Sequence, residues 1–164
     1  MLVIIDMQNH ILDPTSKFYV PTATHLVQPI AQRLEKARKT NEYVLFTRDI
    51  PVEKKGKAEE TNDLQLISAL APLEKEQVIK KYYFTIPPEK LVEIKDNFFT
   101  DKQEEKRIEV VGVETHLCIL ANVLALQSAF PEAEFTINQH LVASKEQQTA
   151  TFDLLRHFNI SIVE

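Results

Sequence analysis

Short apolar runs alternate with longer amphipathic stretches along the whole chain. The first run, residues 2–5, is continuously apolar, which is typical of a strand buried on both faces. Later stretches place an apolar residue every three or four positions, which is the spacing of an amphipathic helix. The pattern predicts strands at 2–5, 43–47, 77–80, 108–113, 134–137 and 160–163, and helices at 22–39, 63–73, 88–98, 119–129 and 144–158.

Strands that alternate with helices are typical of a parallel sheet. We therefore expect an α/β fold with a Rossmann-like, three-layer α/β/α arrangement: a mostly parallel, six-stranded sheet with helices on both faces. The chain shows no internal repeat or linker, so residues 1–164 are expected to form a single domain. Right-handed crossovers bring the carboxyl ends of parallel strands to one edge of the sheet, which is where such folds place their chemistry.

The most informative stretch runs from 107 to 129, where a β-branched strand passes through a short junction into an apolar helix. Gly112 ends the strand and indicates a close backbone approach or unusual dihedral angles. Cys118, the only cysteine, falls near the first helical turn. Unpaired N–H groups and the helix dipole can lower the pKa of a thiol there and make it a thiolate nucleophile. The alternative is that Cys118 is a small buried hydrophobic residue.

Four chemically able side chains follow strands and are expected to converge at one edge of the sheet: Asp6, Asp49, Lys81 and Cys118. In that arrangement Asp6 can take the thiol proton, and Lys81 can hold Asp6 and stabilise developing charge. Backbone N–H groups at the junction can bind an oxyanion. Together these groups favour acyl transfer or hydrolysis at Cys118. Taken singly, Asp6 is also consistent with a turn cap, and Lys81 with a surface lysine like its neighbour Lys80.

Composition narrows the classes of function. The net charge of −5 disfavours general nucleic-acid binding, and the scarcity of glycine disfavours the usual dinucleotide and P-loop sites. A single cysteine cannot form an internal disulfide, no apolar run reaches membrane-spanning length, and the first residues lack the features of a secretory signal. We expect a cytoplasmic protein with no nucleic-acid partner, no membrane partner and no cofactor.

Three separate motifs resemble those of the isochorismatase-like cysteine hydrolases, a family that includes nicotinamidases and N-carbamoylsarcosine amidases. V-V-G-V-E-T-H-L-C-I-L around Cys118 resembles the nucleophile motif, M-L-V-I-I-D-M-Q-N resembles the N-terminal strand, and V-I-K-K-Y-Y-F-T resembles the third-strand lysine motif. A-S-K-E near Ser144 is similar to a late family motif. The motifs follow the family order over the whole chain, and they indicate the family much more specifically than the substrate.

Carried over to this sequence, the resemblance implies Cys118 as nucleophile, Asp6 as base and Lys81 as the supporting lysine. Lys81 is preferred to Lys80 because it fits the V-I-x-K register of the family motif. The family also has a non-proline cis peptide at the junction, which here falls at Val113-Glu114 and aims the N–H groups of Glu114 and Cys118 at the oxyanion. The candidates for the substrate pocket are Gln8, Phe84, Thr115 and His116.

The sequence departs from the family pattern in several places. T-I-P at 85–87 stands where Ser-Ala-Phe is usual, and Asn138 replaces an aspartate of the fifth strand. Metal-binding nicotinamidases carry Asp-x-His after the second strand, whereas Asp49 is followed by I-P. The resemblance therefore implies a site without a catalytic metal and weakens the nicotinamidase interpretation. Family members that act on isochorismate lack the thiol, so Cys118 argues against that reaction.

The leading hypothesis is a metal-independent cysteine hydrolase that cleaves a C–N bond of a small amide or related acyl compound through a thioester. The alternatives are a nicotinamidase or pyrazinamidase, a non-catalytic α/β binding module, and a redox-sensing thiol protein. The charged segment 53–60 is predicted to be a solvated loop, with a flap over the site as the alternative. The expected partners are a small-molecule substrate and further copies of the chain, since family members commonly form oligomers; the aromatic candidates for a dimer contact are Tyr82, Tyr83, Phe98 and Phe99.

Overall fold

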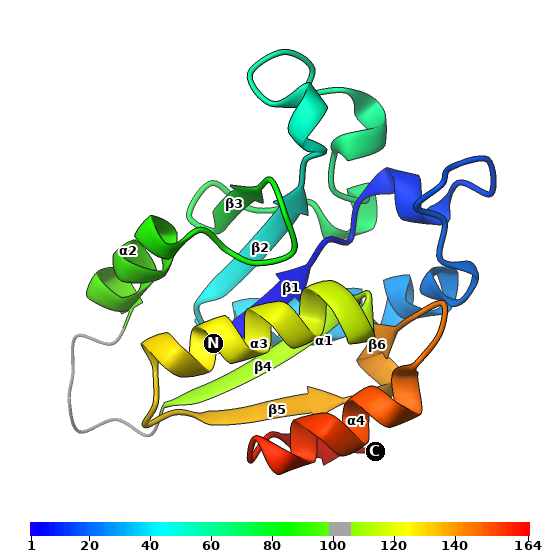
Figure 1. The fold of residues 1–164 in the computed structure, drawn as a ribbon. Coiled ribbons are helices and arrows are strands. Elements are labelled where there is room, and N and C mark those ends of the chain that lie inside the picture. The colour runs from blue at the N-terminus through cyan, green and yellow to red at the C-terminus, as the bar shows by residue number, and fades with distance from the viewer. Residues whose placement is uncertain (99–105) are drawn as a thin grey trace.

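A parallel β-sheet runs through the centre of the computed structural model, which describes residues 1–98 and 106–164 (Figure 1). Phe99, one candidate for a dimer contact, lies outside these ranges. The described strands are β1 (Leu2–Ile5), β2 (Val44–Asp49), β3 (Gln77–Lys81), β4 (Arg107–Val113), β5 (Glu134–Asn138), β6 (Val142–Ala143) and β7 (Ser161–Val163). Their order is β3-β2-β1-β4-β5-β7, with β6 beside β4, and every pairing is parallel. The predicted α/β class and parallel sheet are confirmed.

Helices cover both faces of the sheet (Figure 1). The side chains of β1 alternate between the two faces, and those on each face are buried beneath helices. Leu2 and Ile4 belong to one buried cluster, together with side chains of α1. Val3 and Ile5 belong to the other, together with side chains of α2, α3 and α4. The predicted three layers are therefore confirmed. The bounds are α1 (Val27–Lys39), α2 (Pro88–Phe98), α3 (Leu120–Ala129) and α4 (Gln148–His157), and no helix in the described ranges is long and apolar enough to cross a membrane.

The first predicted helix, 22–39, divides into two parts. Pro21–Leu26 forms 3-10 turns, and only then does α1 begin. Pro29 explains the late start, since proline lacks an N–H group and is tolerated in the first helical turn but not in the interior. Asn41, just past the end of α1, has a left-handed φ of 54°, a conformation in which asparagine commonly ends a helix.

The helix predicted at 63–73 is wrong. Two short 3-10 turns, Asn62–Leu64 and Ser68–Leu70, stand in its place. Between them the chain pairs with the segment that follows β1, where the Ile67 N–H donates to the Met7 carbonyl at 2.9 Å. The apolar side chains that suggested a helix do turn inward, but the backbone groups find their partners in a distant segment.

Ser144 and Gln147 have the spacing of a capping box at the start of the predicted helix 144–158, but no such cap forms. α4 begins at Gln148, and Gln147 precedes it with a left-handed φ of 60° and no side-chain cap. The Ser144 hydroxyl instead donates to the Glu146 carbonyl at 2.8 Å and is hydrogen-bonded to the His116 ring. Ser144 therefore fastens the loop after β6 to the junction before α3.

Two smaller differences concern the last third of the chain. The spacing within the predicted helix 144–158 places Phe152, Leu155 and Phe158 inward. Phe152 and Leu155 are buried, but Phe158 follows the last residue of α4 and is 40% exposed, so the inward position predicted for Phe158 is wrong. The sheet also has a seventh strand in its described part, β6, where six were predicted. β6 is two residues long, which is too short to produce a detectable periodicity.

Candidate active site

Asp6 follows β1 directly and is almost fully buried at the carboxyl edge of the sheet. Its φ of 51° lies in the left-handed region, which aspartate tolerates better than most residues. Thr47 of β2 fixes the carboxylate: the threonine hydroxyl donates to Asp6 Oδ1 at 2.6 Å and accepts the Asp6 N–H at 3.2 Å. This role of Thr47 was not predicted from the sequence, although a polar residue after the apolar run of a strand was the available signal.

Lys81, at the end of β3, is fully buried and contacts the other three strand-end side chains. Its Nζ lies 2.7 Å from Asp6 Oδ2, 3.3 Å from Asp49 Oδ1 and 3.4 Å from Cys118 Sγ. Nζ also donates to the Tyr83 carbonyl at 3.3 Å. Burial by itself would lower the pKa of Lys81, but the acidic groups around it, with Asp6 foremost, raise it above the ordinary value. Lys81 therefore remains a cation and does not serve as the base.

Lys80 points to the opposite face of the same strand, because successive strand residues alternate. Its ammonium pairs with Glu59 at 2.7 Å and with Glu60 at 2.5 Å. Arg48 holds the same segment by donating to the Glu59 carbonyl at 2.6 Å. The last two residues of the charged segment 53–60 are therefore tied to the ends of β2 and β3, and the action of the segment as a flap stays a prediction.

An unusual backbone junction between β4 and α3 presents Cys118. Gly112 has φ of 116°, and a Cβ at this position would lie 2.1 Å from the Ile5 carbonyl oxygen, so a side chain there would collide with β1. The peptide bond Val113-Glu114 is cis. A wide π-helical turn, Thr115–Ile119, then carries the cysteine. The role of this junction as an oxyanion site stays a prediction.

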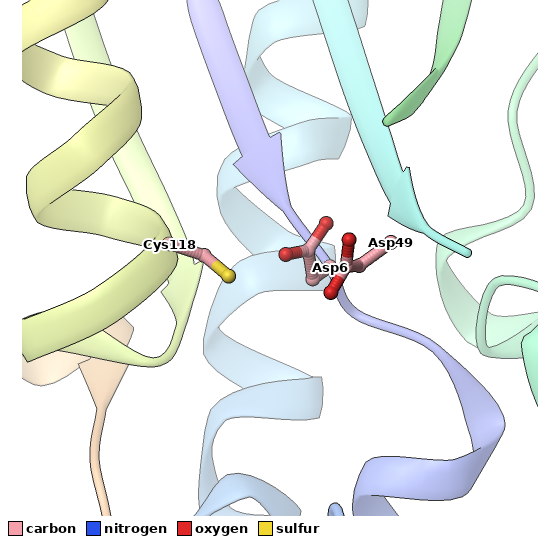
Figure 2. Close-up of side chains that lie close together, drawn as sticks. All are labelled: Asp6, Asp49 and Cys118. Atoms are coloured by element: carbon pink, nitrogen blue, oxygen red, sulfur yellow. The ribbon is translucent and has the colours of Figure 1, made fainter. Parts of the chain in front are cut away.

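The Cys118 thiol is buried and neutral at rest. Burial raises its pKa well above the ordinary value, and Asp6 raises it further by its charge and as a hydrogen-bond acceptor, against the opposing charge of Lys81. The expectation that the helix start lowers this pKa is therefore wrong, because desolvation outweighs it. Cys118 Sγ and carboxylate oxygens of Asp6 and Asp49 lie within 4.8 Å of one another (Figure 2). A thiolate can thus form by proton transfer to a nearby carboxylate.

Asp49, at the end of β2, stands between this cluster and the solvent. Its side chain is 34% exposed, against 6% for Asp6. Gln8 fixes the Asp49 backbone by accepting its N–H at 2.8 Å and donating to its carbonyl at 3.2 Å. Burial raises the pKa of Asp49 to about 6; Lys81 opposes this shift and the charge of Asp6 adds to it. Asp49 was predicted at this edge of the sheet but was not among the predicted catalytic or pocket residues.

Asn122 is a second residue that sequence analysis missed. It is fully buried in the first half of α3, which is otherwise apolar, and its Nδ2 donates to the Cys118 carbonyl at 2.6 Å and to the Phe84 carbonyl at 2.9 Å. Its Oδ1 accepts the Ile86 N–H at 2.8 Å. Asn122 therefore joins the turn that carries Cys118 to the segment after Lys81. The available signal was a lone polar residue within the apolar run 117–126.

The predicted pocket residues have different environments. Gln8 is fully buried, and its amide is committed to backbone groups. Phe84 is exposed and packs edge-on against Tyr83, with 4.7 Å between ring centroids. Thr115 is buried, and its hydroxyl has no hydrogen-bond partner in the described ranges. The Ser144 hydroxyl donates its single proton to a backbone carbonyl, so His116 must donate to it from Nδ1. Their roles in substrate binding stay predictions.

The comparison with protein families matches this chain to one family. The family model for the isochorismatase domain matches residues 1–129. A search of curated proteins finds no match.

Several solved structures share the fold. An isochorismatase family protein from Desulfovibrio vulgaris has a TM-score of 0.82 at 19% identity, over 99% of this chain and 92% of the other. A pyrazinamidase of Pyrococcus horikoshii in complex with zinc has a TM-score of 0.81 at 16% identity, over 99% and 97%. An N-carbamoylsarcosine amidase from Thermoplasma acidophilum has a TM-score of 0.76 at 14% identity, over 99% and 94%. At these identities the comparison establishes the fold alone.

Proposed function

Because the chain belongs to the isochorismatase domain family, we propose that it is a cysteine hydrolase that cleaves a C–N bond of a small amide or related acyl compound. The observation that carries the proposal is the position of the Lys81 ammonium, 2.7 Å from Asp6 and 3.4 Å from Cys118. A buried cation between a carboxylate and the only thiol stabilises negative charge on either group, as proton transfer between them requires. Asp6, Lys81 and Cys118 are the proposed catalytic residues.

In the proposed reaction Asp6 takes the Cys118 proton as Sγ attacks the carbonyl carbon of the substrate. The carbonyl oxygen becomes an oxyanion, for which the backbone N–H groups of Glu114 and Cys118 are the proposed donors. Asp6 then returns the proton to the leaving nitrogen. The C–N bond breaks, and the departing amine or ammonia leaves a thioester on Cys118.

Water cleaves the thioester in the second half of the reaction. Asp6 takes a proton from the attacking water, the C–S bond breaks, and the sulfur recovers that proton as the acid product forms. Lys81 keeps its proton throughout, because the acidic groups around it hold its pKa above the ordinary value. The cycle therefore begins and ends with a neutral thiol beside an ionised Asp6.

The residues at this edge do not fit a resident metal ion. One of the similar structures, the pyrazinamidase, is a zinc complex, and in this chain Asp6, Asp49 and Cys118 bring possible ligand atoms within 4.8 Å of one another. The Lys81 ammonium contacts all three of these side chains. A built-in cation thus lies where a metal ion would bind, and no step of the proposed reaction is assigned to a metal.

The test is ammonia release from a panel of small amides and ureas that includes nicotinamide, pyrazinamide and N-carbamoylsarcosine. We expect Cys118→Ala to abolish release, and intact-mass measurement to show an acyl adduct on the native protein if water cleaves the thioester slowly. Undiminished release by Cys118→Ala would overturn the nucleophile assignment. If the folded native protein cleaves no amide in the panel, the non-catalytic binding module becomes the better interpretation.

The proposal extends to domain, location and assembly. β5, β7 and α4 lie beyond the part matched by the family model, yet they complete the same sheet and core, which supports one domain over the whole chain. The reaction needs Cys118 as a free thiol, which a reducing cytoplasm favours.

Tyr83 is 74% exposed and available for a homodimer contact, whereas Phe98 packs against Tyr43. A monomer in light scattering at high concentration would end the dimer proposal.

A further inference from the structure

Asp49 is a charged residue of the cluster to which the proposed reaction gives no role. The Lys81 ammonium has three N–H groups, but four acceptors surround it: Asp6, Asp49, Cys118 and the Tyr83 carbonyl. Asp49 and Asp6 therefore compete for one ammonium. The strength of the bond between Lys81 and Asp6 depends on how much of that positive charge Asp49 takes.

The position of Asp49 is built into the fold. Gln8 is fully buried and uses its amide to hold both backbone groups of Asp49, at 2.8 and 3.2 Å. Gln8 is itself fixed by donating to the Leu64 carbonyl at 2.8 Å. The parallel register of β2 and β3 sets Asp49 directly beside Lys81. Asp49 Oδ1 is buried against Lys81 although the side chain as a whole reaches solvent.

We propose that Asp49 is a positioning residue, which shares the Lys81 ammonium with Asp6 and so keeps Asp6 basic enough to take the Cys118 proton. If Asp6 held Lys81 alone, its anion would be more stable and it would be a weaker base. A second carboxylate draws part of the positive charge away from both groups, and more from Asp6, 2.7 Å from the ammonium, than from Cys118 at 3.4 Å. The negative charge of Asp49 also raises the pKa of the thiol, as the smallest of the contributions to that shift. The effect on turnover rests on the proposed function, whereas the effect on the thiol can be measured without a substrate.

The titratable groups that act on Asp49 come from each neighbouring element: Asp6 after β1, Lys81 on β3, and Cys118 in the turn before α3. Arg48, beside Asp49 on β2, binds Glu60 at 3.1 Å instead. Because the pKa of Asp49 is raised to about 6, its charge changes just below neutral pH. The share of Lys81 that is left for Asp6 should change in the same range.

The test is the rate at which iodoacetamide alkylates Cys118, followed by intact mass from about pH 5 to pH 9, since the thiolate is the reactive form. Asp49→Asn keeps the shape of the side chain and removes its charge. We expect it to speed alkylation about three- to tenfold at a given pH, because the thiol loses a neighbouring negative charge. Asp49→Glu should return the rate toward that of the native protein. The matched control is Asp153→Asn, which removes an exposed acid on α4 and should change nothing.

The native protein provides a second measurement that needs no variant. Its log rate of alkylation should rise with pH at a slope that flattens near pH 6, because ionisation of Asp49 raises the pKa of the thiol. A slope of one throughout this range, or an Asp49→Asn rate equal to the native rate, would overturn the proposal. A urea midpoint close to the native value excludes unfolding as the cause of faster alkylation.

Turnover separates this inference from the proposed function. On any amide that is cleaved, Asp49→Asn should lower kcat about tenfold with little change in KM, since the variant weakens a base and leaves substrate binding intact. If Cys118 is alkylated faster in Asp49→Asn but the native protein cleaves no amide, the result supports the role of Asp49 and counts against the proposed hydrolase. Normal turnover with unshifted alkylation would remove the role of Asp49 and leave the hydrolase intact.

Discussion

A single proton shared between Asp6 and Cys118 decides the chemistry of this site, and Lys81 influences where that proton rests. The thiol is neutral because burial and the charge of Asp6 raise its pKa. Lys81 acts in the opposite direction from 3.4 Å. The two neighbours of Cys118 therefore have opposite effects on its reactivity, which allows them to be separated by experiment.

Replacing Asp6 by asparagine should speed alkylation of Cys118 and at the same time abolish turnover. Without the carboxylate, the Lys81 ammonium is left to stabilise the thiolate, so we expect iodoacetamide to react about tenfold faster or more at pH 8. Turnover should fall by about 10²–10⁴-fold, because the group that moves the proton is gone. Slower alkylation of Asp6→Asn would contradict the assignment of Asp6 as the group that keeps the thiol neutral.

The two neighbouring lysines offer a matched pair of variants. Lys81→Met should abolish ammonia release and lower the free energy of unfolding by about 3–5 kcal/mol, because it leaves buried carboxylates without their cation. Lys80→Met removes a partly exposed ion pair and should cost about 1 kcal/mol or less. Urea unfolding and ammonia release measured on both variants check this. Equal losses in the two variants would mean that Lys81 has no special role.

The sequence alone was enough to nominate Asp6, Lys81 and Cys118, because each stands where a strand ends or a helix begins. It could not show that Thr47 and Asn122 support them. A polar residue in an apolar element indicates that some partner exists, but the partner lies on another segment. The pKa of the Cys118 thiol could not be predicted from the sequence either, because it depends on how deeply the thiol is buried, and the periodicity of the sequence does not give that depth.

At the scale of elements, the close contact between β1 and β4 depends on Gly112, where the Ile5 carbonyl leaves no room for a side chain. Gly112→Ala should lower the free energy of unfolding by about 2–4 kcal/mol, because the new Cβ would meet the Ile5 carbonyl at 2.1 Å and the φ of 116° is strained for alanine. Gly56→Ala is the control: its φ of 69° is also left-handed, but no atom lies within 4 Å of the new Cβ. It should cost only about 1–2 kcal/mol. A comparison of the urea midpoints of the two variants checks both values. If Gly112→Ala lowers the free energy of unfolding no more than Gly56→Ala does, β1 can move away from β4 to make room for the new Cβ.

The elements that sequence analysis predicted correctly are those whose apolar pattern and hydrogen bonds are both regular. The segment 63–73 has helical spacing, yet its backbone pairs with the chain after β1. Ser144 has the spacing of a cap, yet its hydroxyl bonds Glu146 and His116. In both cases local chemistry suggested one partner and a distant segment supplied another, which no single stretch of sequence can reveal.

On the scale of the whole molecule, the raised pKa of Asp49 links stability to pH. The native state holds this proton more tightly than the unfolded chain does, so the contribution of Asp49 to the free energy of unfolding falls as pH rises from about 4 to about 6. His10 acts in the opposite sense, since burial lowers its pKa and its contribution grows as pH rises toward the ordinary histidine value. The difference between the native protein and Asp49→Asn isolates the first effect. In urea unfolding, the change in the free energy of unfolding from pH 4.5 to pH 6.5 should be less favourable in the native protein than in Asp49→Asn. The same change in both proteins would contradict the raised pKa.

The α/β class and the layers could be predicted because alternating strands and helices leave few other ways to bury the apolar positions. The order of the strands could not be predicted, since it follows from which strands pair across the sheet. That order places β1 between β2 and β4 and sets β3 beside β2, so that the ends of β1, β2 and β3 meet the turn before α3. The convergence of the site therefore depends on the whole sheet.

The charge balance of the cluster has a consequence for what leaves the site after reaction. When Asp49 is ionised, two carboxylates face one ammonium, and the edge of the sheet keeps one net negative charge. Hydrolysis of a neutral amide produces a carboxylate, so the product acquires the same sign of charge as the groups that made it, and like charges at close range repel. The acid should therefore depart readily and inhibit weakly at neutral pH. The acid should dissociate more slowly, and inhibit the reaction more strongly, as the pH falls through about 6 and Asp49 loses its charge.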